Sequence, residues 1–270
     1  MVNVSEGRDR AVLSALAGAG GRRLLDVHTD PHHHRTVLTL AGDGVEDAAR
    51  AVAAEAVARI DLRAHRGAHP RLGVVDVVPF APLEGSTIDD AVAARDRFLA
   101  WAGSETGLAL PGFAYGPERS LPEVRRSAFG ALAPSAGPPT PHPTAGAVCV
   151  GARPVLVAYN VWLAAGAGVD EARRVAAAVR VPGALRALGL DVGGRVQVSM
   201  NLVDPIRVGP ASAFDAVRAL TAVEGAELVG LLPAAVLDAV APERWEELDL
   251  GPSRTIERRL AEQDRPWRRQ

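Results

Sequence analysis

The sequence predicts a protein of mixed α/β or α+β class, because helical and strand patterns alternate along the whole chain. Apolar residues recur every three or four positions over residues 45–60, as on one face of a helix. Residues 196–202 alternate strictly between apolar and polar side chains, the pattern of a half-buried strand. The chain has 270 residues, 48% of them hydrophobic, which is enough for one large unit or two small ones.

In the first half, strands are expected at residues 22–27, 35–40 and 73–80, because these runs are rich in apolar and β-branched side chains. A helix is expected at residues 45–60. A second helix is expected to begin at a capping box formed by residues 86–89, Ser-Thr-Ile-Asp, and to continue to Trp101.

In the second half, strands are expected at residues 155–163 and 196–202. One helical stripe there consists of Val169, Ala172, Ala176 and Val179. A further helix should begin near Ala211, and a short surface helix should follow Gly251. The polar face of the strand at 196–202 either meets solvent or lines a polar site.

Residues 133–144 form the least regular stretch of the chain and are rich in Pro, Ser and Gly. Proline fixes φ and lacks a backbone donor, so this stretch is expected to be neither helix interior nor central strand. Two interpretations stay open: a flexible linker between the halves, or a stiff binding loop.

Composition limits the function classes. The net charge of −2 predicts no general nucleic-acid or anionic-membrane surface, and favours small partners bound in a pocket. Cys149 is the single cysteine and lies in an apolar run, so a buried hydrophobe is expected and no internal disulfide. The first residues lack a secretory signal, and no apolar run is long enough to span a membrane. We therefore expect a soluble cytoplasmic protein.

All seven histidines fall between His28 and His142, which indicates a site in the first half. The histidines do not indicate a metal site, because neither the run His32 to His34 nor the pair His65 and His69 has diagnostic ligand spacing. We therefore expect no metal, although a metal hydrolase stays open as an alternative.

The segment from His65 to Gly73 places two imidazoles and two guanidiniums within seven residues. Imidazole can both accept and donate a proton near neutral pH. Pro70 restricts His69 to extended backbone geometry, and arginines such as Arg71 suit carboxylate partners. The residues alone leave open whether this segment is a functional site or a surface loop.

Several motifs in order along the chain resemble the formiminotransferase domain family. They are Val-Ser-Glu-Gly-Arg at 4–8, Leu-Leu-Asp-Val at 24–27, His-Arg-Thr-Val at 34–37, His-Arg-Gly-Ala-His-Pro-Arg-Leu-Gly at 65–73, Asp-Val-Val-Pro-Phe at 76–80, Gly-Ala-Arg at 151–153 and Gln-Val-Ser-Met-Asn-Leu at 197–202. The resemblance covers nearly the whole chain, and the series is more specific than any one motif.

The resemblance implies an α+β fold of two ferredoxin-like α/β subdomains with mixed sheets and a substrate passage between them, as a homodimer. The expected N-terminal subdomain, with the catalytic histidine, covers residues 1–150. The C-terminal subdomain covers residues 151–260, and residues 261–270 form a tail.

The resemblance also implies an activity: transfer of a formimino group from N-formimino-L-glutamate to N5 of tetrahydrofolate, the co-substrate, with His69 as general acid and base. Implied folate-binding residues are Gly137, Pro138, Pro139, Thr140, Pro141, His142, Pro143, Thr144, Ala145, Gly146 and Gly183. Candidate substrate-binding residues are Arg35, Arg71, Arg153 and Asn201. Alternatives are a related enzyme that uses formylglutamate or 5-formyltetrahydrofolate, and a non-catalytic folate-binding protein.

Overall fold

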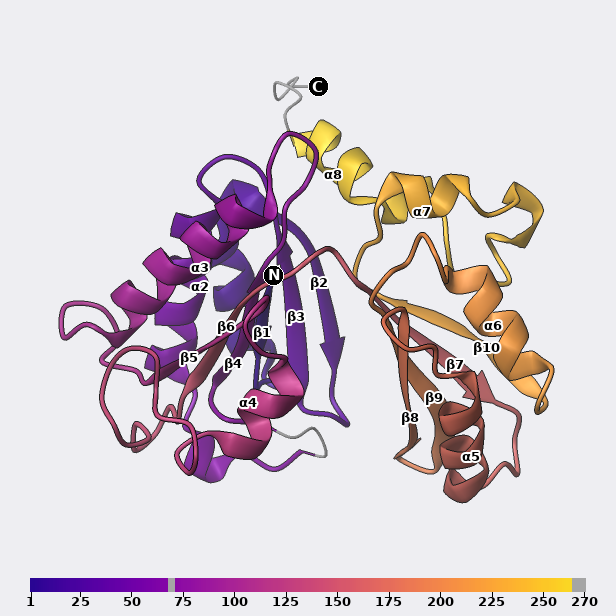
Figure 1. The fold of residues 1–270 in the computed structure, drawn as a ribbon, viewed down its shortest axis with the longest axis horizontal. Coiled ribbons are helices and arrows are strands. Elements are labelled where there is room, and N and C mark those ends of the chain that lie inside the picture. Colours follow the sequence, from indigo (N-terminus) through magenta and orange to yellow (C-terminus); the bar gives the residue numbers. More distant parts are fainter. Residues whose placement is uncertain (68–70, 264–270) are drawn as a thin grey trace. The chain divides into compact units, whose positions relative to one another are not determined.

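The computed structural model describes residues 1–67 and 71–263. The chain divides into two compact units, Met1–Pro154 and Val155–Gln270 (Figure 1). Each unit has its own sheet, its own helices and its own hydrophobic core. The prediction of an α+β fold is therefore confirmed.

The first unit is built on a six-stranded sheet of order β2-β3-β1-β4-β6-β5. Its elements are β1 (Val2–Val4), α1 (Arg10–Gly20), β2 (Leu24–Asp30), β3 (Arg35–Leu40), α2 (Val45–Arg59), β4 (Val75–Phe80), α3 (Ile88–Gly103), β5 (Gly112–Tyr115), α4 (Leu121–Ser127) and β6 (Val148–Ala152). The strands β2, β3, β1 and β4 pair antiparallel, whereas β6 and β5 continue the sheet in parallel to β4. The connection β1-α1-β2-β3-α2-β4 with this strand order is ferredoxin-like.

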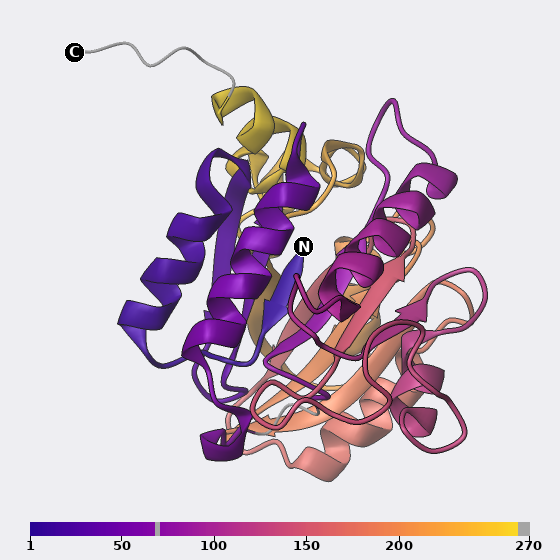
Figure 2. The same ribbon diagram turned by 90° about the vertical axis from the view of Figure 1, so that its left-hand side faces the viewer.

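Helices α1, α2 and α3 cover one face of this sheet (Figure 2). Val2, Val4 and Leu38, from neighbouring strands, are fully buried under them because alternate strand residues face the helices. Helix α4 packs on the opposite face, where Cys149 is fully buried as predicted. Burial raises the pKa of the Cys149 thiol to about 12, so it is no nucleophile at neutral pH.

The second unit has a four-stranded sheet of order β10-β7-β9-β8, again from a βαββαβ connection. Its elements are β7 (Val157–Leu163), α5 (Val169–Val179), β8 (Leu185–Val192), β9 (Arg195–Leu202), α6 (Pro210–Arg218), β10 (Val223–Val229), α7 (Ala234–Asp238) and α8 (Ile256–Gln263). All three pairings are antiparallel. The expectation of mixed sheets thus holds for the first unit and is wrong for the second, whose strands, within the described residues, pair only antiparallel.

Most predicted elements form with small shifts in their ends. Strand β2 begins at Leu24, because Gly21–Arg23 form a turn of 3₁₀-helix first. The capping box of α3 pairs Thr87 with Asp90, one residue later than predicted. On β9 the apolar positions are buried, and so is Gln197 at 2% exposure, although it lies on the polar face.

The proline-rich stretch at 133–144 lies inside the first unit. Strand β6 follows it and pairs with both β4 and β5, so β6 spans the expected boundary at residue 150. The chain passes between the units after Pro154. Over residues 1–67 and 71–263, no helix combines the length and apolar character needed to cross a membrane.

Candidate functional site

Three chain segments converge at the end of the first sheet where β4 begins, which we call the Gly73 end. Strand β1 leads out of the sheet there, because Val4 pairs with Val75. The turn between β2 and β3 lies at the same end, because Asp30 pairs with Arg35 and Thr36 pairs with Val4. Residues 71–74 lead into β4 at this point. These segments therefore place charged side chains together at one end of the sheet.

Glu6 organises the turn that leaves β1. Its Oε1 accepts hydrogen bonds from the backbone N–H groups of Gly7, Arg8 and Asp9, at 2.8, 2.7 and 3.0 Å. Burial would raise the pKa of Glu6, but these donors outweigh burial and lower it. Glu6 is therefore a fixed negative charge at this end of the sheet.

His34 faces this carboxylate from the turn between β2 and β3. Its Nδ1 accepts a hydrogen bond from Gly7 N at 3.1 Å and lies 3.5 Å from Glu6 Oε1. Burial lowers the pKa of His34, while the charge of Glu6 opposes that effect. His34 has a left-handed backbone, with φ of 52°, which holds the turn tight against Gly7.

His65 is 9% exposed and packs its ring against that of His34, with 4.1 Å between ring centroids. Its Nε2 lies 3.0 Å from His34 O, and its Nδ1 lies 2.5 Å from Arg71 Nη1. Arg71 also donates from Nη2 to Gly67 O at 3.0 Å. Burial is the largest influence that lowers the pKa of His65, and the charge of Arg71 adds to it.

A buried ion pair lies beneath this segment. Asp76 is 2% exposed, and its Oδ1 accepts a hydrogen bond from Leu72 N at 2.8 Å. Its Oδ2 accepts from Arg125 Nη2 of α4 at 2.5 Å. Arg35 Nη2 donates to Asn3 Oδ1 at 2.7 Å, and the charge of Asp76 opposes the lowering of the Arg35 pKa by burial.

The implied folate-binding loop meets the same end of the sheet through its last residues. Thr144 O accepts from Leu62 N at 2.8 Å, and Ala145 O accepts from Val74 N at 2.9 Å. His142 Nδ1 accepts from Ala145 N at 3.0 Å, which closes the loop on itself. Gly146 has φ of 71°, and a Cβ there would lie 2.2 Å from Leu72 O, so only glycine fits.

The earlier part of this loop, which begins at Gly137, is more exposed, and Gly137 does not pack on the residues around Gly73 described above. Gly137 packs against Gly103 and Leu110 instead. The exposed residues of the loop are Gly137, Pro139, Thr140, Pro141 and Pro143.

The remaining predicted residues lie elsewhere. Arg153 N donates to Phe80 O, so Arg153 lies at the opposite end of β4 from Arg71. Asn201, exposed on β9, and Gly183, with φ of 74° before β8, belong to the second unit. His69 lies outside the described residues. The structure therefore brings Arg35, Arg71 and residues 144–146 together.

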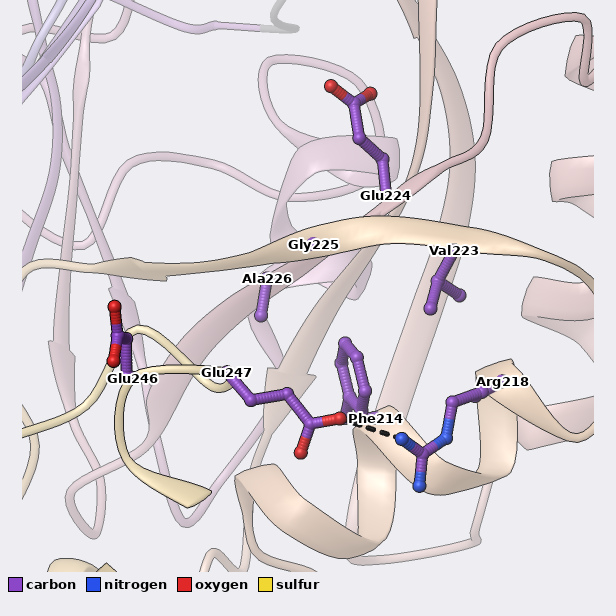
Figure 3. Close-up of a pocket in the computed structure, with 8 residues that line it drawn as sticks. All are labelled: Phe214, Arg218, Val223, Glu224, Gly225, Ala226, Glu246 and Glu247. Atoms are coloured by element: carbon purple, nitrogen blue, oxygen red, sulfur yellow. Dashed lines mark hydrogen bonds and ion pairs between the residues drawn. The ribbon is translucent and has the colours of Figure 1, made fainter. Parts of the chain in front are cut away.

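Among the described residues, neither metal ligation nor the hollow in the second unit adds a further candidate. The described residues contain no group of three His, Cys, Asp or Glu side chains that could hold a metal ion. In the second unit a shallow hollow of about 450 Å³ lies over Phe214, with the ion pair of Arg218 and Glu247 beside it (Figure 3). Its lining among the described residues includes no predicted site residue.

Glu6, His34 and His65 are not among the predicted site residues, whereas Arg71, the other partner of His65, is. Glu6 belongs to the Val-Ser-Glu-Gly-Arg motif, and this is the one sequence feature that could have identified it as a site residue. The motif does not predict its contact with His34, which lies twenty-eight residues away in sequence. His34 precedes β3 and His65 precedes β4, and they meet because β1 pairs with both of these strands.

The lowered pKa values predict acid destabilisation in two pH ranges. His34 and His65 favour the neutral form when folded, so their contribution to stability is complete above the ordinary pKa of 6.5 and is lost as pH falls through their folded pKa values. Burial would raise the pKa of Asp30, but hydrogen bonds from His33 and His32 lower it from 3.8 to about 2, so its contribution disappears between those values.

Thermal unfolding measured from pH 7 to pH 5 checks the first range. The midpoint should fall with pH in the wild type, and the fall should be smaller in a variant that combines His34→Asn with His65→Asn. An equal slope in both proteins would contradict the assignment.

Comparison with known proteins gives the family. The formiminotransferase domain, N-terminal subdomain, matches residues 1–153. Glutamate formimidoyltransferases from Streptococcus pyogenes serotype M1 and Thermoplasma acidophilum are 35% and 34% identical, over 88% of this chain in each case and 90% and 89% of those proteins. The formimidoyltransferase-cyclodeaminase of Sus scrofa is 36% identical over 88% of this chain, which spans 51% of that longer protein. The chain belongs to the formiminotransferase domain family.

Proposed function

We propose that this protein is a glutamate formimidoyltransferase, which transfers the formimino group of N-formimino-L-glutamate to N5 of tetrahydrofolate. The similarity to proteins of that name extends over nearly nine-tenths of the chain, at 35% identity over 88% for the Streptococcus protein. The family match covers the first unit, in which we place the catalytic histidine.

One observation carries the proposal furthest. The end of the implied folate loop is bonded to both flanks of the histidine-bearing segment, through Leu62 before it and Val74 after it. Two segments that the sequence separates by about seventy residues thus share the Gly73 end of the sheet. This contact supports a site in which a folate held by residues 137–146 meets the imidazole of His69.

The chemistry asks for one group that both removes and supplies a proton. N5 of tetrahydrofolate attacks the formimino carbon and forms a C–N bond, which gives a tetrahedral intermediate. His69 accepts the proton that N5 loses and then donates it to the departing glutamate nitrogen as the old C–N bond breaks. The products are 5-formiminotetrahydrofolate and glutamate, and the protons balance without an added acid or base.

We assign this role to His69 because the neighbouring His65 is already engaged. Both ring nitrogens of His65 have protein partners, His34 O and Arg71. Burial and the charge of Arg71 lower the pKa of His65, which disfavours the protonated form that an acid catalyst requires.

The carboxylates of the donor need cationic partners near this site. Arg35 and Arg71 lie at the Gly73 end, whereas Arg153 lies at the far end of β4. Arg8 is a further candidate, because it follows Glu6 and its Nε donates to Pro31 O in the same turn region. We also propose that the protein is a homodimer, as the resemblance implies. We further propose a cytoplasmic location, because a protein whose single cysteine, Cys149, is a free buried thiol suits a reducing compartment.

The test offers tetrahydrofolate with either N-formimino-L-glutamate or N-formyl-L-glutamate to the purified protein and measures glutamate and the modified folate by mass spectrometry. We expect formimino transfer, with a higher kcat/KM than for the formyl donor. Faster transfer from the formyl compound would favour the formyl-transfer alternative. Binding of tetrahydrofolate without turnover of either donor would indicate a non-catalytic folate-binding protein. Activity abolished by a chelator would point to the metal-dependent alternative.

A further inference from the structure

We propose that His65 and Arg71 form a positioning pair that fixes the two ends of the short stretch between Gly67 and Arg71. The proposal rests on the proposed function, because His69 lies within that stretch in the sequence. In this view Arg71 acts on the chain itself, not mainly on a substrate carboxylate.

The two contacts of the His65 ring define its protonation state. A backbone carbonyl can only accept, so the 3.0 Å contact with His34 O requires a proton on Nε2. A guanidinium can only donate, so the 2.5 Å contact with Arg71 Nη1 requires a lone pair on Nδ1. Both contacts are satisfied by one species, the neutral ring with its proton on Nε2. His65 is thus a fixed acceptor for Arg71.

Arg71 uses two separate nitrogens to bridge the segment. Nη1 donates to the ring of His65, and Nη2 donates at 3.0 Å to the carbonyl of Gly67. A planar guanidinium holds both donors in one rigid fork, so the side chain sets the distance between Gly67 and its own backbone. Lysine, with one terminal nitrogen on a flexible stem, could not reproduce this pair of directions.

The pair is anchored to the rest of the first unit through the turn at His34. A Cβ on Gly67 would lie 2.7 Å from His33 O and 2.7 Å from the Cβ of His34, so the backbone of Gly67 rests directly on that turn. The ring of His65 packs on the ring of His34 as well. The turn at His34 is in turn bonded to Gly7. The His65–Arg71 pair therefore connects the segment to β1 and β3.

The two possible roles of Arg71 predict different kinetics. If Arg71 mainly bound a donor carboxylate, its loss would raise KM for N-formimino-L-glutamate. If Arg71 positions the segment, its loss lowers kcat while KM changes little, because misplacement of a reacting group by about 1 Å can cost about 100-fold in rate. The same split applies to His65, which is a positioning residue here.

Two conservative variants of His65 separate its two hydrogen bonds. The side-chain oxygen of asparagine occupies the place of Nδ1, so His65→Asn keeps the acceptor for Arg71 and loses the donor to His34 O. Glutamine reaches the place of Nε2, so His65→Gln keeps the donor and loses the acceptor. We expect kcat within about threefold of the wild type for His65→Asn, and a loss of about 10- to 100-fold for His65→Gln and for Arg71→Lys. KM for N-formimino-L-glutamate should stay within about threefold in all three variants.

Thermal unfolding of the three variants is the control for folding, and kinetics are measured below the lowest midpoint. A rise in KM with unchanged kcat for Arg71→Lys would overturn the proposal in favour of carboxylate binding. Equal kcat values for the asparagine and glutamine variants would overturn it too, because the acceptor for Arg71 would then be irrelevant.

A spectroscopic readout separates failure of this proposal from failure of the proposed function. Nitrogen NMR of protein labelled at histidine should show His65 at pH 7 with an unprotonated Nδ1 and a protonated Nε2. A wild type that shows this tautomer but transfers no formimino group would contradict the proposed function and leave the pair intact. A wild type that is active but carries the proton on Nδ1 would contradict the pair.

Discussion

Replacement of His69 by alanine is expected to lower kcat for formimino transfer by about 10² to 10⁴-fold, because a positioned acid and base contributes rate accelerations of that size. The loss should appear in kcat rather than in the affinity for tetrahydrofolate, since the proposal gives the folate to residues 137–146. Steady-state kinetics and fluorescence titration of the folate measure the two quantities separately.

His32→Ala is the matched control, because it removes another imidazole of the same unit whose ring contacts His33. That variant should keep wild-type kcat within about twofold. If His69→Ala transfers the formimino group at the wild-type rate, the proton-handling role belongs to another residue and the proposed mechanism fails.

Removal of the carboxylate of Asp76 is expected to lower the free energy of unfolding by about 3–5 kcal/mol, the usual effect when one member of a buried ion pair is deleted. Asp76 is 2% exposed and bonds both Arg125 and the backbone of Leu72. In Asp76→Ala, the guanidinium of Arg125 loses its carboxylate partner, and Arg35 loses a nearby negative charge.

Chemical denaturation of Asp76→Ala, Asp76→Asn and Glu55→Ala gives the comparison. The asparagine variant keeps an acceptor for Leu72 N and should lose less stability than the alanine variant. Glu55 pairs with Arg59 on the surface of α2, so its removal should cost no more than about 0.5 kcal/mol. A small and equal effect for both Asp76 variants would show that the buried ion pair contributes little.

The sequence predicted about half of the helices and strands, because hydrophobic period depends on neighbouring residues alone, but it did not predict α1, α4, β8 or β10. Strand β3 was predicted with its observed bounds, and α2 and α5 follow their apolar stripes closely. The burial of Cys149 followed from its apolar run. The sequence also indicated the segment from His65 to Gly73 as a candidate site, because two imidazoles and two guanidiniums gather there.

The ordered motifs carried the family prediction, which the comparisons confirm. The motifs did not predict that the second sheet is antiparallel. A sheet becomes mixed only when a parallel strand is added, as β6 is in the first unit, and strand pairing depends on residues far apart in the sequence. The motifs also did not show that β6 belongs to the first unit, because its partners β4 and β5 are far from it in sequence.

Only the tertiary structure decided which charges meet. Asp76 and Arg125 are 49 residues apart in sequence. They pair because α4 packs against the sheet at β4, where Val124 and Val77 belong to one buried cluster. The Nε2 proton of His65 is held by the carbonyl of His34, 31 residues away, which leaves Nδ1 as the acceptor for Arg71. This contact forms because the turn between β2 and β3 reaches the start of β4. Local sequence encodes helices and strands, but the protonation state and partner of a side chain depend on groups that only chain topology brings within hydrogen-bonding distance.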